Sequence, residues 1–88
     1  MTLGIVIVTY ECRELVLECL ASVERYLPAA LESTVVIDNA SGDGTLEALG
    51  RRFPAVRGVA KAKNVGFASA ANAGIRLLPN CDAICLLN

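Results

Sequence analysis

The sequence contains no histidine and no tryptophan, and only four of its 88 residues are tyrosine or phenylalanine. A zinc site would therefore depend on the cysteines, which stand at positions 12, 19, 81 and 85. Their spacing includes no C-x-x-C pair, so it disfavours zinc. Two disulfides are a further alternative. We expect free thiols that pack as small hydrophobic side chains.

An excess of positive charge is also absent. Eight basic and nine acidic residues give a formal net charge of −1, and no basic stripe follows the chain. This balance argues against nucleic acid as a partner and against electrostatic membrane binding. The apolar runs Leu3–Tyr10 and Ala83–Leu87 are too short to span a bilayer, and no secretory signal is recognisable. We expect a cytoplasmic protein, with peripheral attachment at the inner membrane face as an alternative for the full-length form.

Apolar residues, in contrast, are abundant. They make up 55% of the chain, and its mean hydropathy is +0.53. Small soluble domains usually lie near 45–50%. We therefore expect residues 1–88 to be part of a larger domain whose remainder covers apolar surface. On its own, such a piece is expected to self-associate.

The hydrophobic pattern alternates between strands and helices. Buried strands are predicted by short β-branched runs and helices by apolar residues at three- and four-residue spacing. In the first helix, Leu15, Cys19, Val23 and Leu27 recur every four residues, with Leu20 beside them. The strands are expected at Leu3–Thr9, Thr34–Ile37, Val56–Ala60 and Ala83–Leu87, and the helices at Arg13–Leu27, around Leu46–Phe53 and at Gly66–Leu78. This order predicts an α/β fold with a mostly parallel sheet and helices on both faces.

Polar side chains stand at the carboxyl ends of the expected strands, the edge where open parallel sheets bind ligands. They come from Thr9-Tyr10, Asp38-Asn39-Ala40-Ser41, the Lys63-Asn64 loop and Asn88. Together they have the chemistry to stack a base, accept hydrogen bonds from it and hold a ribose. Taken singly, each is also explained as a turn or helix-capping residue. The region Gly42-Asp43-Gly44 has only two of the three glycines of a dinucleotide fingerprint, and no Walker motif is present, which disfavours dehydrogenases and P-loop proteins.

Five motifs, in order and with consistent spacing, resemble family-two inverting glycosyltransferases along nearly the whole chain. They are I-V-I-V-T-Y (5–10), C-L-A-S (19–22), V-V-I-D-N-A-S-G-D-G-T (35–45), F-P (53–54) followed by N-V-G-F-A (64–68) with A-N-A-G-I (71–75), and L-L-N (86–88). The D-N-A-S-x-D-G-T and N-x-G-F-A pieces are most similar to bacterial rhamnosyltransferases and related enzymes that build cell-surface polysaccharides. The resemblance implies a Rossmann-like nucleotide-binding half of a GT-A fold.

The resemblance also implies roles for individual residues. Thr9 and Tyr10 would line the uridine- or thymidine-type base, and Asp38 would accept a hydrogen bond from it. The remaining nucleotide-binding residues that it implies are Asn39 and Ser41 in the same pocket, Asn64 and Gly66 at its border, and Asn72 close to the ribose and diphosphate.

The family's acidic motif, which binds Mg²⁺ or Mn²⁺, would begin just after Asn88, and its general base would follow much later. No catalytic or metal-binding residue is therefore expected within residues 1–88. The resemblance implies that this part supplies donor-nucleotide binding to an enzyme that uses a UDP- or dTDP-sugar. That enzyme would transfer the sugar, with inversion, to a saccharide or lipid-linked acceptor.

Two other classes of protein remain as alternatives. A non-catalytic flavodoxin-like module would explain the strand–helix alternation but not the ordered motifs. A nucleotidyltransferase normally has a glycine- and arginine-rich loop after its first strand, where this chain has Glu11-Cys12-Arg13.

Overall fold

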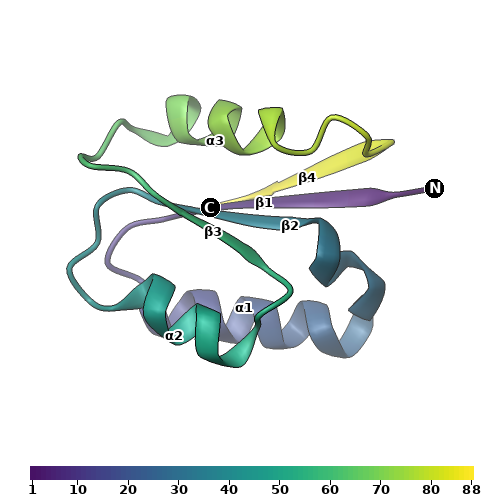
Figure 1. Cartoon of the computed structure of the whole chain (residues 1–88), viewed down its shortest axis with the longest axis horizontal. Helices are drawn as coiled ribbons and strands as arrows, with labels where there is room; N and C mark the ends of the chain where they lie inside the picture. Colours follow the sequence, from purple (N-terminus) through teal and green to yellow (C-terminus); the bar gives the residue numbers. More distant parts are fainter.

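A computed structural model describes all 88 residues and shows a single four-stranded sheet flanked by helices (Figure 1). The elements are β1 (Leu3–Thr9), α1 (Arg13–Tyr26), the 3₁₀ helix η1 (Pro28–Ser33), β2 (Thr34–Asp38), α2 (Thr45–Arg52), β3 (Arg57–Ala60), α3 (Phe67–Arg76) and β4 (Ala83–Leu87). All four expected strands and all three expected helices are present, with bounds that differ by at most two residues at an end.

The strands are all parallel and are ordered β3-β2-β1-β4. The inner position of β1 agrees with its uninterrupted apolar sequence, because a strand between two neighbours and two helical layers meets no water. Helices α1 and α2 cover one face of the sheet and α3 covers the other (Figure 1). The α/β fold predicted from the strand–helix alternation is confirmed.

Two apolar cores result, one on each face. The larger joins β1 and β2 to α1, α2 and η1 through Ile5, Ile7, Val16, Leu17, Leu20, Val23, Ala30, Val36, Leu49, Phe53 and Val56. The smaller lies under α3 and contains Val8, Val35, Ile37, Ala70 and Ala71. Small residues on α3, such as Ala70, Ala71 and Gly74, let this helix approach the sheet closely.

Helix α1 is rotated relative to the expected stripe. Leu15 and Leu27 are exposed by 66% and 49%, whereas Val16 and Leu17 are buried. Residues spaced by four advance about 40° around a helix at each step, because one turn takes 3.6 residues. The four-residue repeat therefore drifts away from the sheet, and the prediction that all its members face the core is wrong at both ends.

Pro28 follows the end of α1 and begins η1. Two hydroxyl groups fix this turn: Ser33 Oγ donates to the carbonyl of Leu3 (2.6 Å) and Thr34 Oγ1 to that of Ala30 (2.7 Å). The 3₁₀ helix thereby delivers the chain into β2 beside the start of β1.

Strand β4 forms one edge of the sheet and leaves Leu86 44% exposed. All four cysteines are free thiols. No helix combines the length and apolar character needed to cross a membrane.

Candidate functional site

The carboxyl ends of β1 and β2 place Thr9 and Asp38 side by side. The two residues are register partners in the parallel pair, so their side chains point to the same face, the one covered by α1 and α2. They are only 4% and 5% exposed. The hydroxyl oxygen of Thr9 is buried and has no hydrogen-bond partner in the chain. Buried polar groups are nearly always paired, so this atom marks a place where a partner is to be expected.

Ser41 positions the Asp38 carboxylate. Its hydroxyl donates a hydrogen bond to Asp38 Oδ1 and accepts one from the backbone N–H of Glu11 (2.8 Å). The single hydroxyl proton of Ser41 is thus committed to the carboxylate. The structure places Ser41 beside Asp38, as expected, but as the group that orients it.

Further hydrogen bonds join the loops that follow β1 and β2. Glu11 Oε1 accepts from the N–H of Gly42 (2.7 Å), and Asp43 Oδ2 accepts from the N–H of Arg13 (3.1 Å). Arg13 Nη1 in turn donates to the carbonyl of Asp43 (3.1 Å). The hydrogen bond from the Thr45 hydroxyl, with smaller contributions from backbone N–H groups, holds the pKa of Asp43 below its ordinary value.

The same two loops carry the only non-glycine residues with positive φ, Glu11 (52°) and Ala40 (67°). Such conformations cost about 1–3 kcal/mol and concentrate at binding and catalytic sites. At Glu11, the hydrogen bonds between the two loops offset this cost, because both the backbone and the side chain of Glu11 take part in them.

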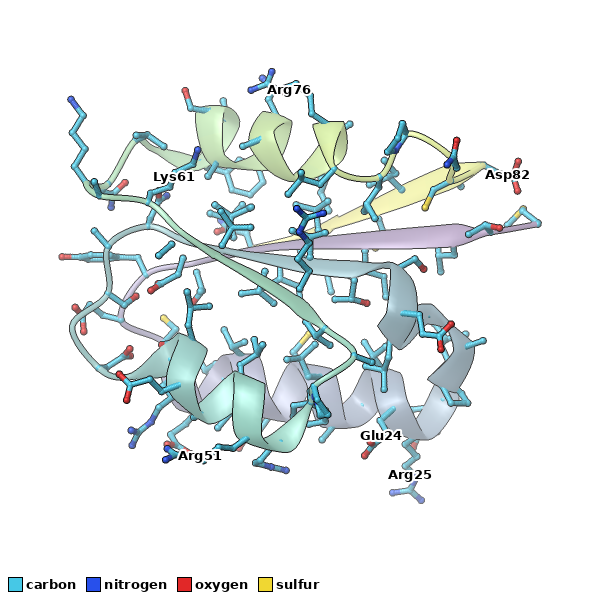
Figure 2. All side chains as sticks on the ribbon, viewed as in Figure 1. Glu24, Arg25, Arg51, Lys61, Arg76 and Asp82 are labelled. Carbon is cyan, nitrogen blue, oxygen red and sulfur yellow. The ribbon has the colours of Figure 1, made fainter.

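The loop between β3 and α3 forms the third side of the site. The backbone N–H of Lys61 donates to the carbonyl of Asp38 (2.8 Å), which ties the start of this loop to β2. Asn39 then binds the backbone of Val65 and Gly66, and Asn64 Oδ1 accepts from the N–H of Gly66 (2.8 Å). Figure 2 shows Lys61 at this edge, whereas Glu24, Arg25, Arg51 and Arg76 point away from the sheet. The edge thus combines a buried carboxylate with a basic side chain.

Tyr10 and Asn72 lie at the surface of the site. Tyr10 is 51% exposed at the end of β1, and Asn72 is exposed on α3. Neither side chain makes a hydrogen bond within the chain. The ring of Tyr10 is therefore available to pack against a ligand. Asn72 is farther along α3 than the turn that Asn39 holds, and no contact links it to the other predicted residues.

A pocket of about 230 Å³ opens at the carboxyl end of β1, between α1 and β4. Its lining is mainly apolar and consists of Ile7, Val8, Thr9, Tyr10, Cys12, Leu15, Val16, Cys19, Leu87 and Asn88. Of the eight predicted nucleotide-binding residues, only Thr9 and Tyr10 line this pocket, and the other six lie outside it. Pockets that hold a whole ligand usually measure about 300–1,000 Å³, so this one suits part of a ligand.

Comparison with known proteins decides the family. The family described as glycosyl transferase family 2 matches residues 4–86, nearly the whole chain. This chain belongs to glycosyl transferase family 2. The sequence resemblance is thereby confirmed, and the ordered motifs that a flavodoxin-like module leaves unexplained are accounted for.

A solved structure agrees with this assignment. The mannosyltransferase PcManGT from Pyrobaculum calidifontis, in complex with GDP-Man and Mn²⁺, superposes with a TM-score of 0.73 at 30% sequence identity. The match covers 85% of this chain and 24% of the mannosyltransferase, so the chain spans about a quarter of that enzyme's length. No curated protein matches the chain.

The residues that join the two loops by hydrogen bonds, chiefly Glu11 and Arg13, were not predicted from the sequence. Their signal was weak because a charged residue in a turn is usually only solvated. In the sequence, Glu11-Cys12-Arg13 stands out only as a departure from the nucleotidyltransferase pattern. Nor were Cys12, Leu15 and Cys19 predicted as pocket residues, because apolar residues at helical spacing are normally assigned to a core.

The 88 residues contain no group of three or more His, Cys, Asp or Glu side chains that could hold a metal ion. Asp38 is bonded by Ser41, and Asp43 by Thr45 and Arg13, and neither belongs to a cluster of carboxylates. The residues present therefore do not fit the divalent cation that the family resemblance implies.

Proposed function

We propose that the full-length protein is a nucleotide-sugar glycosyltransferase and that residues 1–88 supply its donor-nucleotide-binding part. The donor is a UDP- or dTDP-sugar, and the acceptor is a saccharide or a lipid-linked saccharide. Transfer proceeds with inversion. Family membership and the likeness to a mannosyltransferase complexed with GDP-Man support the reaction class.

The observation that carries the proposal is the paired, buried Thr9 and Asp38 at the carboxyl edge. Asp38 offers a carboxylate acceptor held in place by Ser41, and Thr9 offers a hydroxyl without a partner. A uracil or thymine ring presents one imide N–H donor flanked by two carbonyl acceptors. A carboxylate next to a hydroxyl matches this pattern, and the exposed ring of Tyr10 supplies a stacking surface.

In the proposed reaction, these residues bind and orient the donor and do not transfer protons. The acceptor hydroxyl attacks the anomeric carbon as the nucleoside diphosphate leaves from the opposite side. The general base that removes the acceptor proton is proposed to lie outside residues 1–88. The divalent cation, Mg²⁺ or Mn²⁺, is likewise proposed to be held after Asn88, because no ligand cluster exists in these residues.

We further propose that the enzyme acts in the cytoplasm, or at the inner membrane face, in the assembly of cell-surface polysaccharide. The similarity of the D-N-A-S-x-D-G-T and N-x-G-F-A motifs to bacterial rhamnosyltransferases supports this. The choice of nucleotide base is the part most directly open to experiment.

Isothermal titration calorimetry on the full-length protein tests the proposal with UDP, dTDP and GDP. We expect UDP or dTDP to bind more tightly than GDP, and Asp38→Ala to weaken binding by about 1.5–3 kcal/mol, the range for a charged hydrogen bond. Glu24→Ala is the matched control, because Glu24 is exposed on α1 and points away from the site (Figure 2). If wild-type protein binds no nucleoside diphosphate, the proposed function is wrong. If Asp38→Ala binds as wild type does, only the role of Asp38 is wrong.

A further inference from the structure

The side chain of Asn39 is buried, and both of its polar atoms already bond to the neighbouring loop. Its side-chain Oδ1 accepts from the N–H of Val65 (3.3 Å), and its Nδ2 donates to the carbonyl of Gly66 (3.2 Å). The residue is 3% exposed. Because the side chain is buried and oriented by these two bonds toward residues 65 and 66, turning it toward a nucleotide would break them, which is costly for a buried amide.

The turn that Asn39 holds depends on glycine. Gly66 has φ of 83° and ψ of 171°, a combination that residues with a Cβ rarely adopt. Nothing lies within 4 Å of the position where a Cβ would be, so the conformation, not lack of space, requires glycine. The carbonyl of Gly66 also accepts from the N–H of Ala70 (3.3 Å), inside α3. Asn39 is therefore connected through one carbonyl oxygen to the first turn of α3.

The turn also carries Asn64, whose side chain caps the N–H of Gly66 (2.8 Å). Asn39 follows Asp38 directly, but successive side chains leave a strand on opposite faces. Asp38 thus points to the face of α1 and α2, while Asn39 reaches the loop on the α3 side. Of these two adjacent residues, Asp38 is therefore placed to meet the base, and Asn39 holds the neighbouring loop.

We propose that Asn39 is a positioning residue for donor binding. The inference rests on the proposed function. Asn39 fixes the turn at residues 64–66 and, with it, the start of α3 against the carboxyl edge of the sheet. It sets the shape of the nucleotide pocket without touching the nucleotide.

The test combines two measurements on the full-length protein: amide hydrogen exchange and nucleoside diphosphate affinity. Asn39→Ala should raise the exchange rate of the Val65 N–H on the order of tenfold, because its acceptor is lost, and should raise the Kd for UDP or dTDP by a similar factor. The backbone amides of β2 should remain protected, which shows that the sheet is intact. Asn80→Ala is the matched control, because it is the same change at an exposed turn after α3.

A double-mutant cycle with Gly66→Ala separates positioning from contact. If Asn39 acts through the turn, Gly66→Ala already disturbs the pocket, so the two changes together raise Kd by less than the product of their single effects. Multiplicative effects would mean that Asn39 acts separately from the turn, and they would overturn the inference. Asn39→Ser provides a second variant if Asn39→Ala does not fold. Its hydroxyl keeps a hydrogen-bonding group at this position but cannot span both Val65 and Gly66, and we expect a smaller rise in both quantities.

Two further outcomes also contradict the inference. Weaker nucleotide binding with unchanged Val65 exchange would show direct contact between Asn39 and the nucleotide. Faster Val65 exchange with unchanged affinity would show a turn that does not shape the pocket. If wild-type protein binds neither UDP, dTDP nor GDP, the proposed function itself fails. That result is distinct from the others, because the exchange measurement needs no ligand.

Discussion

Gly74 lies in α3 where this helix crosses β1, and replacing it with alanine tests the packing of the helix on the sheet. A Cβ at this position would lie 2.5 Å from Val6 Cγ1 and 3.2 Å from Cγ2, and 3.4 Å from Ile37 Cγ1. Val6 is fully buried and β-branched, so its side chain has little freedom to turn aside. The helix must instead move away from the sheet.

The magnitude follows from two opposing effects. Overpacking a core costs about 1–3 kcal/mol, and a 2.5 Å contact with a rigid group belongs in the upper half of that range. Alanine is better than glycine inside a helix by about 1 kcal/mol. We expect Gly74→Ala to lower the free energy of unfolding by about 1–2 kcal/mol. Nucleotide affinity should also fall, because α3 carries the turn at residues 64–66.

Gly50 provides the matched control. It also lies inside a helix, α2, but nothing is found within 4 Å of the position where its Cβ would be. Gly50→Ala should therefore stabilise the protein by about 0.5–1 kcal/mol through helix propensity alone. Urea unfolding followed by circular dichroism measures both variants. Equal stabilisation by the two substitutions would refute the close approach of α3 to Val6.

Three further predictions concern acid stability, thiol reactivity and activity. Asp43 has a lowered pKa in the folded protein, so its contribution to stability is complete above its unfolded pKa and is lost as the pH falls through the folded pKa. In urea titrations from pH 5 to pH 2, Asp43→Asn should flatten this loss of stability, and an unchanged slope would contradict the assignment. Burial, and secondarily the neighbouring Cys85, raises the pKa of the Cys19 thiol. Iodoacetamide should therefore modify Cys19 more slowly than the exposed Cys12 when the two are followed by mass spectrometry, and the reverse order would contradict this. Residues 1–88 expressed alone should transfer no sugar in a nucleotide-release assay, because they hold no metal cluster, and any measurable turnover would disprove this.

The sequence by itself determined the elements and their order. The β-branched run at Leu3–Thr9 has no polar interruption, and a strand of that kind is stable only between neighbours in a covered sheet. The structure places it there. Turn residues and prolines marked the ends of the helices well, because these residues restrict the backbone locally. The alternation of strands and helices then implied parallel pairing, since each helix returns the chain to the same end of the sheet.

Tertiary structure decided how these elements meet. Periodicity placed Leu15 and Leu27 on the buried stripe of the first helix, but Leu15 lies off the face that meets the sheet and Leu27 follows the end of α1, and both are exposed. The sequence also brought Asp38, Asn39 and Ser41 to the correct edge without revealing that only Asp38 keeps an acceptor for a ligand. Apart from the local bond between Ser41 and Asp38, the side-chain hydrogen bonds that assign these roles join residues 26 to 31 positions apart in the chain, such as Asn39 with Val65 and Glu11 with Gly42. Local sequence patterns report the conformation of one segment, whereas such bonds exist only after the crossovers have brought separate segments together.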